Sequence, residues 1–172
     1  RQRQMCIRDR LRLFALTMTT ESVRAHFESL GLNLPIIEHE QSTATVALAA
    51  EAFGVAPGQI AKTLAFRLAS GEAVLVVASG DARVDNAKFQ QVLGKGKMLA
   101  HDEVTSLTGH PVGGVCPFGL ATALPIYLDE SLKAWRELLP AAGGTRNGVR
   151  VTPEQMATIT QGRWVDVCKP SE

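Results

Sequence analysis

The sequence predicts a single domain of mixed α and β structure, built on a mixed sheet. Its 172 residues suit one domain that can bury a sizeable core. Helical and strand patterns alternate along the chain, which is typical of parallel strands joined by helices. A hairpin is also indicated, because Ser70-Gly71 separates two apolar runs at 62–68 and 73–78. A hairpin places antiparallel strands in the sheet, so the sheet is mixed.

The helices are predicted from capping residues that precede apolar residues at helical spacing. Gly31, Gly54 and Gly94 mark helix ends, and Pro140 stops a helix. In chain order, we expect helices after Thr19 or Thr20, over 44–53 after Thr43, over 86–93 after Asp85, from Asp102 to before Gly109, from Asp129 or Ser131 to before Pro140, and from Pro153 after Thr152.

The strands are predicted from short apolar runs bounded by turn residues. In chain order, they are 35–39, 62–68, 73–78, 97–100, 124–128, 149–151 and 163–168. The run 73–78, A-V-L-V-V-A, has no polar face, which predicts a strand buried on both sides. The segment 55–60 contains Pro57 and Gly58 and is expected to be a turn or a short helical turn.

Composition excludes several classes of protein. Apolar residues make up 45% of the chain and charged residues 20%, as in ordinary globular domains. No apolar run is long enough to span a membrane. The three cysteines are an odd number without close spacing, which favours a reducing compartment over a disulfide framework or a zinc site. We therefore expect a cytoplasmic protein without a bound metal.

The first seventeen residues differ from the rest of the chain. They hold five arginines against Asp9, a net charge of +4. Residues 18–172 hold 13 Lys and Arg against 16 Asp and Glu, a net charge of −3. We expect 1–17 to be a non-native or disordered leader, with the natural start at Met18 and one domain over 18–172. The alternative is a transit peptide, but the segment lacks the serine richness of such peptides.

The segment Gly109–Leu120, G-H-P-V-G-G-V-C-P-F-G-L, contains four glycines and two prolines. That density excludes a helix interior or a central strand. Gly113 and Gly114 allow close approach of another molecule to the backbone. The segment is therefore either a tight turn between buried elements or a rigid loop that lines a ligand site.

The reactive side chains leave several interpretations open. No P-loop, dinucleotide fingerprint or zinc-helix motif is present. Cys116 is the candidate nucleophile and His110 could approach it, although a free cysteine is more often a buried small hydrophobe. Lys62 is either a lysine at a strand end or a fixed cation for a phosphate or carboxylate. His26 is expected to face solvent.

Three blocks of sequence resemble the YbaK/ProX family of aminoacyl-tRNA deacylases, which also occurs as the editing insertion of bacterial prolyl-tRNA synthetases. They are Q-I-A-K-T-L-A-F at 59–66, V-D-N-A-K-F-Q-Q-V-L-G at 84–94 and G-H-P-V-G-G-V-C-P-F-G at 109–119. The C-terminal W-V-D-V-C-K is also similar to one branch. The likeness covers about residues 20–169, nearly the whole domain.

The resemblance implies an α+β fold with a mixed, strongly twisted six- to seven-stranded sheet that forms a partial barrel surrounded by helices. It implies hydrolysis of the ester that joins a wrong amino acid to the terminal adenosine of a tRNA. The family uses neither a metal nor a covalent intermediate, so no cofactor is expected. The implied partners are the acceptor end of an aminoacyl-tRNA and a prolyl-tRNA synthetase.

The resemblance also implies roles for residues. Lys62 would position the substrate, and the backbone of Gly113 and Gly114 would hold the water or the developing oxyanion. The expected substrate-binding residues are His110, Val115, Cys116, Pro117, Phe118, Ala142, Gly143, Thr45 and Val46. Many relatives carry Ser or Thr in place of Cys116, which leaves alanine, serine, threonine and cysteine open as the amino acid removed.

The charge of −3 over 18–172 bears on how a tRNA would be held. Proteins that follow a long stretch of nucleic acid usually have a basic surface, and this domain has only Lys88, Lys95 and Lys97 as candidates. Contact mainly with the acceptor end is therefore expected. Two other functions stay open: a noncatalytic module that binds an aminoacyl adenylate or amino acid, and a cysteine hydrolase that uses Cys116 and His110.

Overall fold

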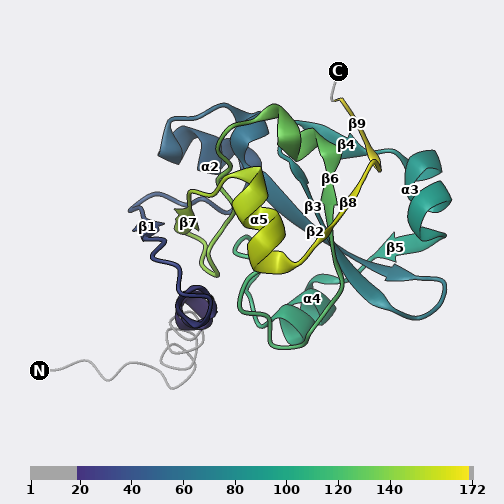
Figure 1. Ribbon diagram of the computed structural model, residues 1–172, viewed down its shortest axis with the longest axis horizontal. Helices are drawn as coiled ribbons and strands as arrows, with labels where there is room; N and C mark the ends of the chain where they lie inside the picture. Colours follow the sequence, from purple (N-terminus) through teal and green to yellow (C-terminus); the bar gives the residue numbers. More distant parts are fainter. Residues whose placement is uncertain (1–18, 171–172) are drawn as a thin grey trace, which may run out of the picture.

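The computed structural model describes residues 19–170. Its centre is a five-stranded mixed sheet with the strand order β5-β2-β3-β6-β8 (Figure 1). The strands are β2 (Ala61–Leu68), β3 (Ala73–Ser79), β5 (Gly96–Met98), β6 (Ile126–Asp129) and β8 (Arg163–Val165). β2 is antiparallel to both β3 and β5, whereas β6 is parallel to both β3 and β8. The predicted mixed α+β fold is confirmed.

Two small antiparallel sheets complete the β structure. One pairs β1 (Ile36–Glu38) with β7 (Asn147–Val149), and the other pairs β4 (Ala82–Val84) with β9 (Cys168–Pro170). The strands are thus divided among three sheets and do not close into a barrel. The predicted leader, 1–17, lies outside the described residues.

The hairpin is confirmed, with Lys62 opposite Ala78 and Arg67 opposite Ala73. β3 is the middle strand of the sheet, and Val74 through Ala78 are fully buried. The reason is that separate clusters of apolar side chains cover its two faces. The absence of a polar face in this strand therefore correctly predicted burial on both sides.

The helices surround the sheet (Figure 1). They comprise a first helix over 19–29, α2 (Val46–Phe53), α3 (Asn86–Leu93), α4 (His101–Thr108) and α5 (Pro153–Thr160), with 3-10 turns η1 (Pro57–Gln59) and η2 (Glu130–Ala134). The caps Asp85 and Thr152 accept backbone N–H groups as predicted. α2 begins later than expected, because Thr45 rather than Thr43 caps it by accepting from Leu48 N.

Several predicted strands are displaced by one or two residues, and two predicted elements differ more. The helix expected to continue to Leu138 ends as η2, because Leu138 exchanges backbone hydrogen bonds with Val151 and Leu139 donates to Gln59. The strand expected over 163–168 is divided into β8 and β9, since Asp129 draws the Val167 N–H to its carboxylate between them. In both cases a partner distant in sequence decides the conformation.

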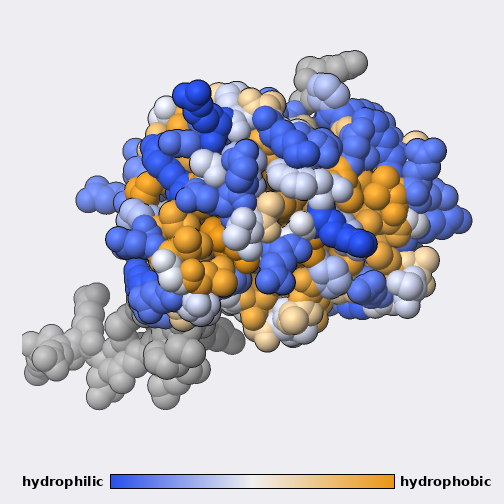
Figure 2. Space-filling view, viewed as in Figure 1, coloured by the Kyte–Doolittle hydropathy of each residue, from blue (hydrophilic) through white to orange (hydrophobic). Residues whose placement is uncertain are grey.

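On the face shown in Figure 2, hydrophilic residues predominate, with patches of apolar residues between them. Apolar atoms commonly contribute more than half of a folded protein's surface, so scattered patches of this kind carry no functional argument alone. No helix among residues 19–170 is long and apolar enough to cross a membrane. The functional argument therefore depends on the hollows of the molecule and on the side chains that line them.

Candidate functional site

A cavity of about 400 Å³ lies where four segments meet. These are the start of α2 (43–46), the first half of β2 (61–65), the glycine-rich loop at Val112, Gly113 and Val115, and the segment 139–147 at Leu139, Ala141 and Asn147. The rim is formed by Met98, Leu99 and the start of α4. A volume of this size suits a small molecule or the end of a larger one.

One wall of the cavity is a free strand edge. In β2, the odd-numbered residues point their backbone N–H and C=O groups away from β3, as the bond from Leu99 N to Ala65 O demonstrates. β5 pairs only with residues 66–68, so the groups of Thr63 have no ladder partner on that side. A strand edge that faces a cavity offers both donors and acceptors to a ligand.

Thr63 adds a second unpaired group to this wall. Its hydroxyl is buried and has no hydrogen-bond partner within residues 19–170. Most buried polar side-chain atoms in proteins are paired, because an unpaired one destabilises the fold by about 1–3 kcal/mol. The hydroxyl therefore requires a functional or structural explanation.

Lys62 lines the cavity, and its ammonium group is already hydrogen-bonded. Nζ donates to the carbonyl of Ala82 and, at 3.4 Å, to that of Gly80. Burial lowers the pKa of Lys62, while the nearby Cys168 and Asp81 act in the opposite direction. The lysine is thus a half-buried cation fixed against the end of the hairpin.

The glycine-rich loop reaches the cavity through Gly113 and Val115. Gly113 has φ +85°, and a Cβ there would lie 2.7 Å from the Cβ of Ala44. Gly114 is buried and packs against the backbone of Gly144, and its N–H donates to Pro111 O at 2.9 Å. No bond within residues 19–170 uses the N–H of Gly113 or Val115, which makes these two the candidate oxyanion donors.

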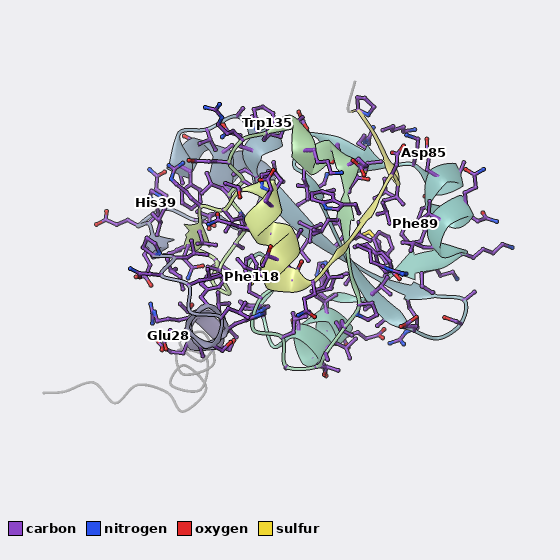
Figure 3. The ribbon with its side chains drawn as sticks, in the orientation of Figure 1. Glu28, His39, Asp85, Phe89, Phe118 and Trp135 are labelled. Atoms are coloured by element: carbon purple, nitrogen blue, oxygen red, sulfur yellow. The ribbon has the colours of Figure 1, made fainter. Side chains whose placement is uncertain are left out.

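The first helix holds the glycine-rich loop in place. Ser22 Oγ donates to Gly119 O at 3.0 Å, and the Gly119 N–H donates to His26 Nδ1 at 2.8 Å. Phe27 packs edge-on against Phe118 at 5.0 Å between ring centroids, and Figure 3 shows Phe118 inside the fold near this helix. The prediction that His26 faces solvent is confirmed only in part, because the side chain is half-buried and its Nδ1 accepts this bond.

His110 and Cys116 lie in the core below the loop. Both are fully buried and absent from the cavity lining. His110 Nε2 is 2.7 Å from Phe118 O, and a carbonyl only accepts, so this nitrogen carries the proton. Burial lowers the pKa of His110, so the ring is neutral. Desolvation raises the pKa of Cys116 to about 12, which disfavours the thiolate that a nucleophile requires.

The second small-residue loop, 141–147, is built around Asn147. Its Oδ1 accepts the N–H of Gly144 at 3.0 Å, and its Nδ2 donates to Thr20 Oγ1 at 3.2 Å. Ala142 is fully buried in the core, and Gly143, at φ +89°, packs against the backbone of Thr19. Of this loop, Ala141 and Asn147 face the cavity.

The predicted site residues thus fall into two groups. The cavity brings together Lys62, Gly113, Val115, Thr45 and Val46. The remaining predicted residues are buried and do not line it: Gly114, His110, Cys116, Pro117, Phe118, Ala142 and Gly143. Sequence reasoning missed Thr63, although it directly follows Lys62, because nothing local shows that one edge of β2 is free.

The cavity lining contains two titratable side chains, Lys62 and His101, among the described residues. No group of three or more histidine, cysteine or acidic side chains within residues 19–170 could hold a metal ion. The polar groups that line this site are therefore backbone donors and acceptors, hydroxyl groups, one lysine, one histidine, and Asn147, whose amide already bonds Gly144 and Thr20.

Comparison with known proteins places the chain in one family. Residues 40–159 match the model of the aminoacyl-tRNA editing domain. "Uncharacterized protein YwhH" of Bacillus subtilis is 43% identical over 157 residues, covering 90% of this chain and all of that protein. The Enterococcus faecalis protein named "Putative Cys-tRNA(Pro)/Cys-tRNA(Cys) deacylase EbsC" is 28% identical over 69% of this chain and 73% of its own length.

A solved structure titled "Crystal structure of a putative trans-editing enzyme for prolyl tRNA synthetase" superposes with a TM-score of 0.81. It is 35% identical and covers 88% of this chain and 97% of that chain. The family model spans well over half of the chain and includes every element that lines the cavity. The chain therefore belongs to the aminoacyl-tRNA editing domain family, of the YbaK type that its sequence resembles.

Proposed function

We propose that this protein is a trans-editing deacylase, which hydrolyses the ester between a small amino acid and the terminal adenosine of a mischarged tRNA. The proposed carrier is tRNA(Pro), and the proposed partner is prolyl-tRNA synthetase. The observation that supports this most directly is the cavity, which combines unpaired backbone N–H groups with a fixed lysine in an editing domain. Its walls at Ala44, Ala61 and Ala141 suit a small side chain.

The proposed reaction needs a water molecule, a site for the oxyanion and a route for the proton. Water adds to the ester carbonyl carbon, and we propose that the N–H groups of Gly113 and Val115, which line the cavity and have no partner within residues 19–170, stabilise the negative oxygen that forms. The ribose oxygen then leaves with a proton, which yields a free amino acid and an uncharged tRNA. No carboxylate among the described residues lines the cavity, so we propose that a neighbouring ribose hydroxyl assists this proton transfer.

Lys62 has a positioning role in this proposal. Its ammonium is fixed by the carbonyls of Gly80 and Ala82, so it is a preorganised positive charge beside the cavity. A cation in this position attracts the phosphate or the ester of the bound aminoacyl end.

A panel of substrates tests the function. tRNA(Pro) is charged in turn with alanine, serine, threonine and cysteine, and release of the amino acid is measured with the purified protein. Release of at least one of them well above the uncatalysed rate supports the proposal and names the substrate. If none is released while a stable aminoacyl-adenosine analogue binds, the protein is a noncatalytic binding module. That alternative is favoured by one observation, the engagement of Lys62 by backbone carbonyls.

A further inference from the structure

A second hollow of about 700 Å³ adjoins the cavity, and Met98 and Leu99 line both. This outer hollow lies over the far end of the β2–β3 hairpin, β5 and the start of α3. Three cations line it, Arg67, Lys95 and Lys97, against the single carboxylate of Glu103. The two hollows are therefore neighbours, and the outer one is lined mainly by cations among its charged side chains.

Arg67 and Lys97 lie on the same face of the sheet, and Lys95 directly precedes β5. Arg67 and Lys97 are directly opposite each other in the β2–β5 register, and Lys95 is two residues before Lys97. Side chains two residues apart on a strand point to the same face, and opposite residues share a face. Thr63, which lines the cavity, has the same parity as Arg67, so their side chains lie on the same face of β2.

Two of these cations have no counter-charge. Lys95 and Lys97 form no salt bridge within residues 19–170, and both are exposed. By contrast, Arg67 is paired with Glu103 at 3.0 Å and Lys88 with Asp166 at 3.1 Å. Residues 18–172 carry a net charge of −3. The unpaired lysines therefore make the surface beside the cavity locally positive on a domain that is negative as a whole.

The pairing of Arg67 with Lys97 is unfavourable in the free protein. Like charges directly opposite on neighbouring strands destabilise a sheet, and Glu103 compensates for one of the two cations only. A bound anion would relieve this repulsion. Arg67 is four positions after Thr63, which corresponds to about 13 Å along the strand. An anionic group bound at Arg67 would thus lie outside the cavity but close to a ligand inside it.

We infer that Arg67, Lys95 and Lys97 bind phosphates of the single-stranded acceptor end of tRNA, whose last nucleotide enters the cavity. This inference rests on the proposed function, which supplies the polynucleotide. Single strands are commonly held by a positively charged groove that follows their backbone, and exposed Met98 offers an apolar surface between the hollows. The site explains how a domain of net negative charge holds a tRNA by its end.

The test compares two double variants with equal loss of charge. Lys95→Gln with Lys97→Gln removes the unpaired cations, and Arg163→Gln with Lys169→Gln removes two exposed cations from strands away from β5. Binding of uncharged tRNA is measured by fluorescence anisotropy between 50 and 200 mM salt, conditions over which phosphate contacts weaken strongly. Deacylation is measured with aminoacyl-tRNA and with 3′-O-aminoacyl adenosine, which has no phosphate.

We expect the Lys95/Lys97 variant to bind tRNA about tenfold more weakly at low salt, with a salt slope reduced by about 0.7 for each lost contact. KM for aminoacyl-tRNA should rise while hydrolysis of aminoacyl adenosine is unchanged, and the Arg163/Lys169 variant should resemble the wild type. Equal affinity and slope in both variants would overturn the inference. So would aggregation of the Lys95/Lys97 variant with unchanged affinity, because the lysines would then only protect the edge strand.

These experiments distinguish failure of the phosphate site from failure of the proposed deacylase function. If the wild type hydrolyses neither substrate, the deacylase proposal fails, and the anisotropy measurement alone decides whether the lysines bind the acceptor end. If the wild type hydrolyses both substrates and the two variants are equally active on aminoacyl-tRNA, the deacylase proposal stands and the phosphate site is wrong.

Discussion

Nε2 of His110 lies 3.5 Å from Sγ of Cys116, yet the pair is not arranged as a nucleophile and its base. The same nitrogen donates its proton to Phe118 O, so it has no lone pair with which to accept the thiol proton. Nδ1, which could accept, is buried and has no partner within residues 19–170. The contact is therefore part of the packing beneath the glycine-rich loop.

This arrangement predicts that Cys116→Ser keeps deacylation within about tenfold of the wild-type rate, because the exchange changes little volume. In a Cys6→Ser background, iodoacetamide at pH 8 should leave both Cys116 and Cys168 unmodified in the native protein, since burial raises both pKa values to about 12. Mass spectrometry of the treated protein, with a urea-unfolded sample as the positive control, gives the result. Rapid labelling of Cys116 with loss of activity would restore the cysteine-hydrolase interpretation.

Gly114→Ala should lower both stability and deacylation. A Cβ at this position would lie 2.8–3.0 Å from the backbone of Gly144, so the two loops behind the cavity would have to separate. We expect a loss of about 1–3 kcal/mol in the free energy of unfolding, as for other overpacked sites, and a rate lower by at least tenfold.

Gly54→Ala is the matched control for Gly114→Ala. Gly54 has φ +67° but open space around it, so the substitution strains the backbone without moving the loop. It should cost stability and leave the rate per folded molecule unchanged. Urea unfolding and deacylation are measured for both variants. A Gly114→Ala protein with wild-type activity would show that the packing of the two loops is irrelevant to the reaction.

Thr63→Val should separate stability from activity. The substitution removes a buried hydroxyl that has no partner within residues 19–170, so the free energy of unfolding should rise by about 1 kcal/mol. If the hydroxyl serves the substrate, deacylation falls about tenfold, and Thr63→Ser restores it. Thermal unfolding and deacylation of the two variants provide the measurement. Unchanged activity in Thr63→Val would leave the unpaired hydroxyl without a role in the reaction.

Lys62→Met should remove most deacylation while the protein stays folded, since methionine keeps the packing of the lysine methylene groups but not the charge. Circular dichroism verifies the fold, and the substrate panel measures the activity. Lys133→Met, at an exposed lysine paired with Glu130, is the control and should keep full activity. Wild-type rates in Lys62→Met would remove the lysine from the mechanism.

The difference in the free energy of unfolding between the wild type and Lys62→Met should depend on pH. The pKa of Lys62 is lowered by burial from the ordinary value of 10.5, so the unfolded chain binds more protons than the folded one between the lowered pKa and 10.5. Across that window, wild-type stability should rise with pH relative to Lys62→Met. Below the lowered pKa the difference should be constant. Urea unfolding at several alkaline pH values measures it, and a difference that falls as pH rises would contradict the lowered pKa.

Local chemistry was enough to predict most elements. Some signals depend only on residues that are close in sequence, so the sequence was enough to predict them. They are the Ser70-Gly71 turn, the helix caps Asp85 and Thr152, and the helix end at Gly94. The apolar run of β3 likewise correctly predicted a buried strand. The resemblance, carried by the blocks around Lys62 and Gly113, identified the family, which the match over residues 40–159 confirms.

Tertiary structure alone decided the rest. The free edge of β2 exists because β5 pairs with only three of its residues, and no local signal reports the length of a neighbouring strand. Pairing of Leu138 with Val151 likewise overrode the helical pattern after Asp129. The proton on His110 is fixed by Phe118 O, and the repulsion between Arg67 and Lys97 by the strand register. Each depends on contacts between residues distant in sequence, which only the folded chain brings together.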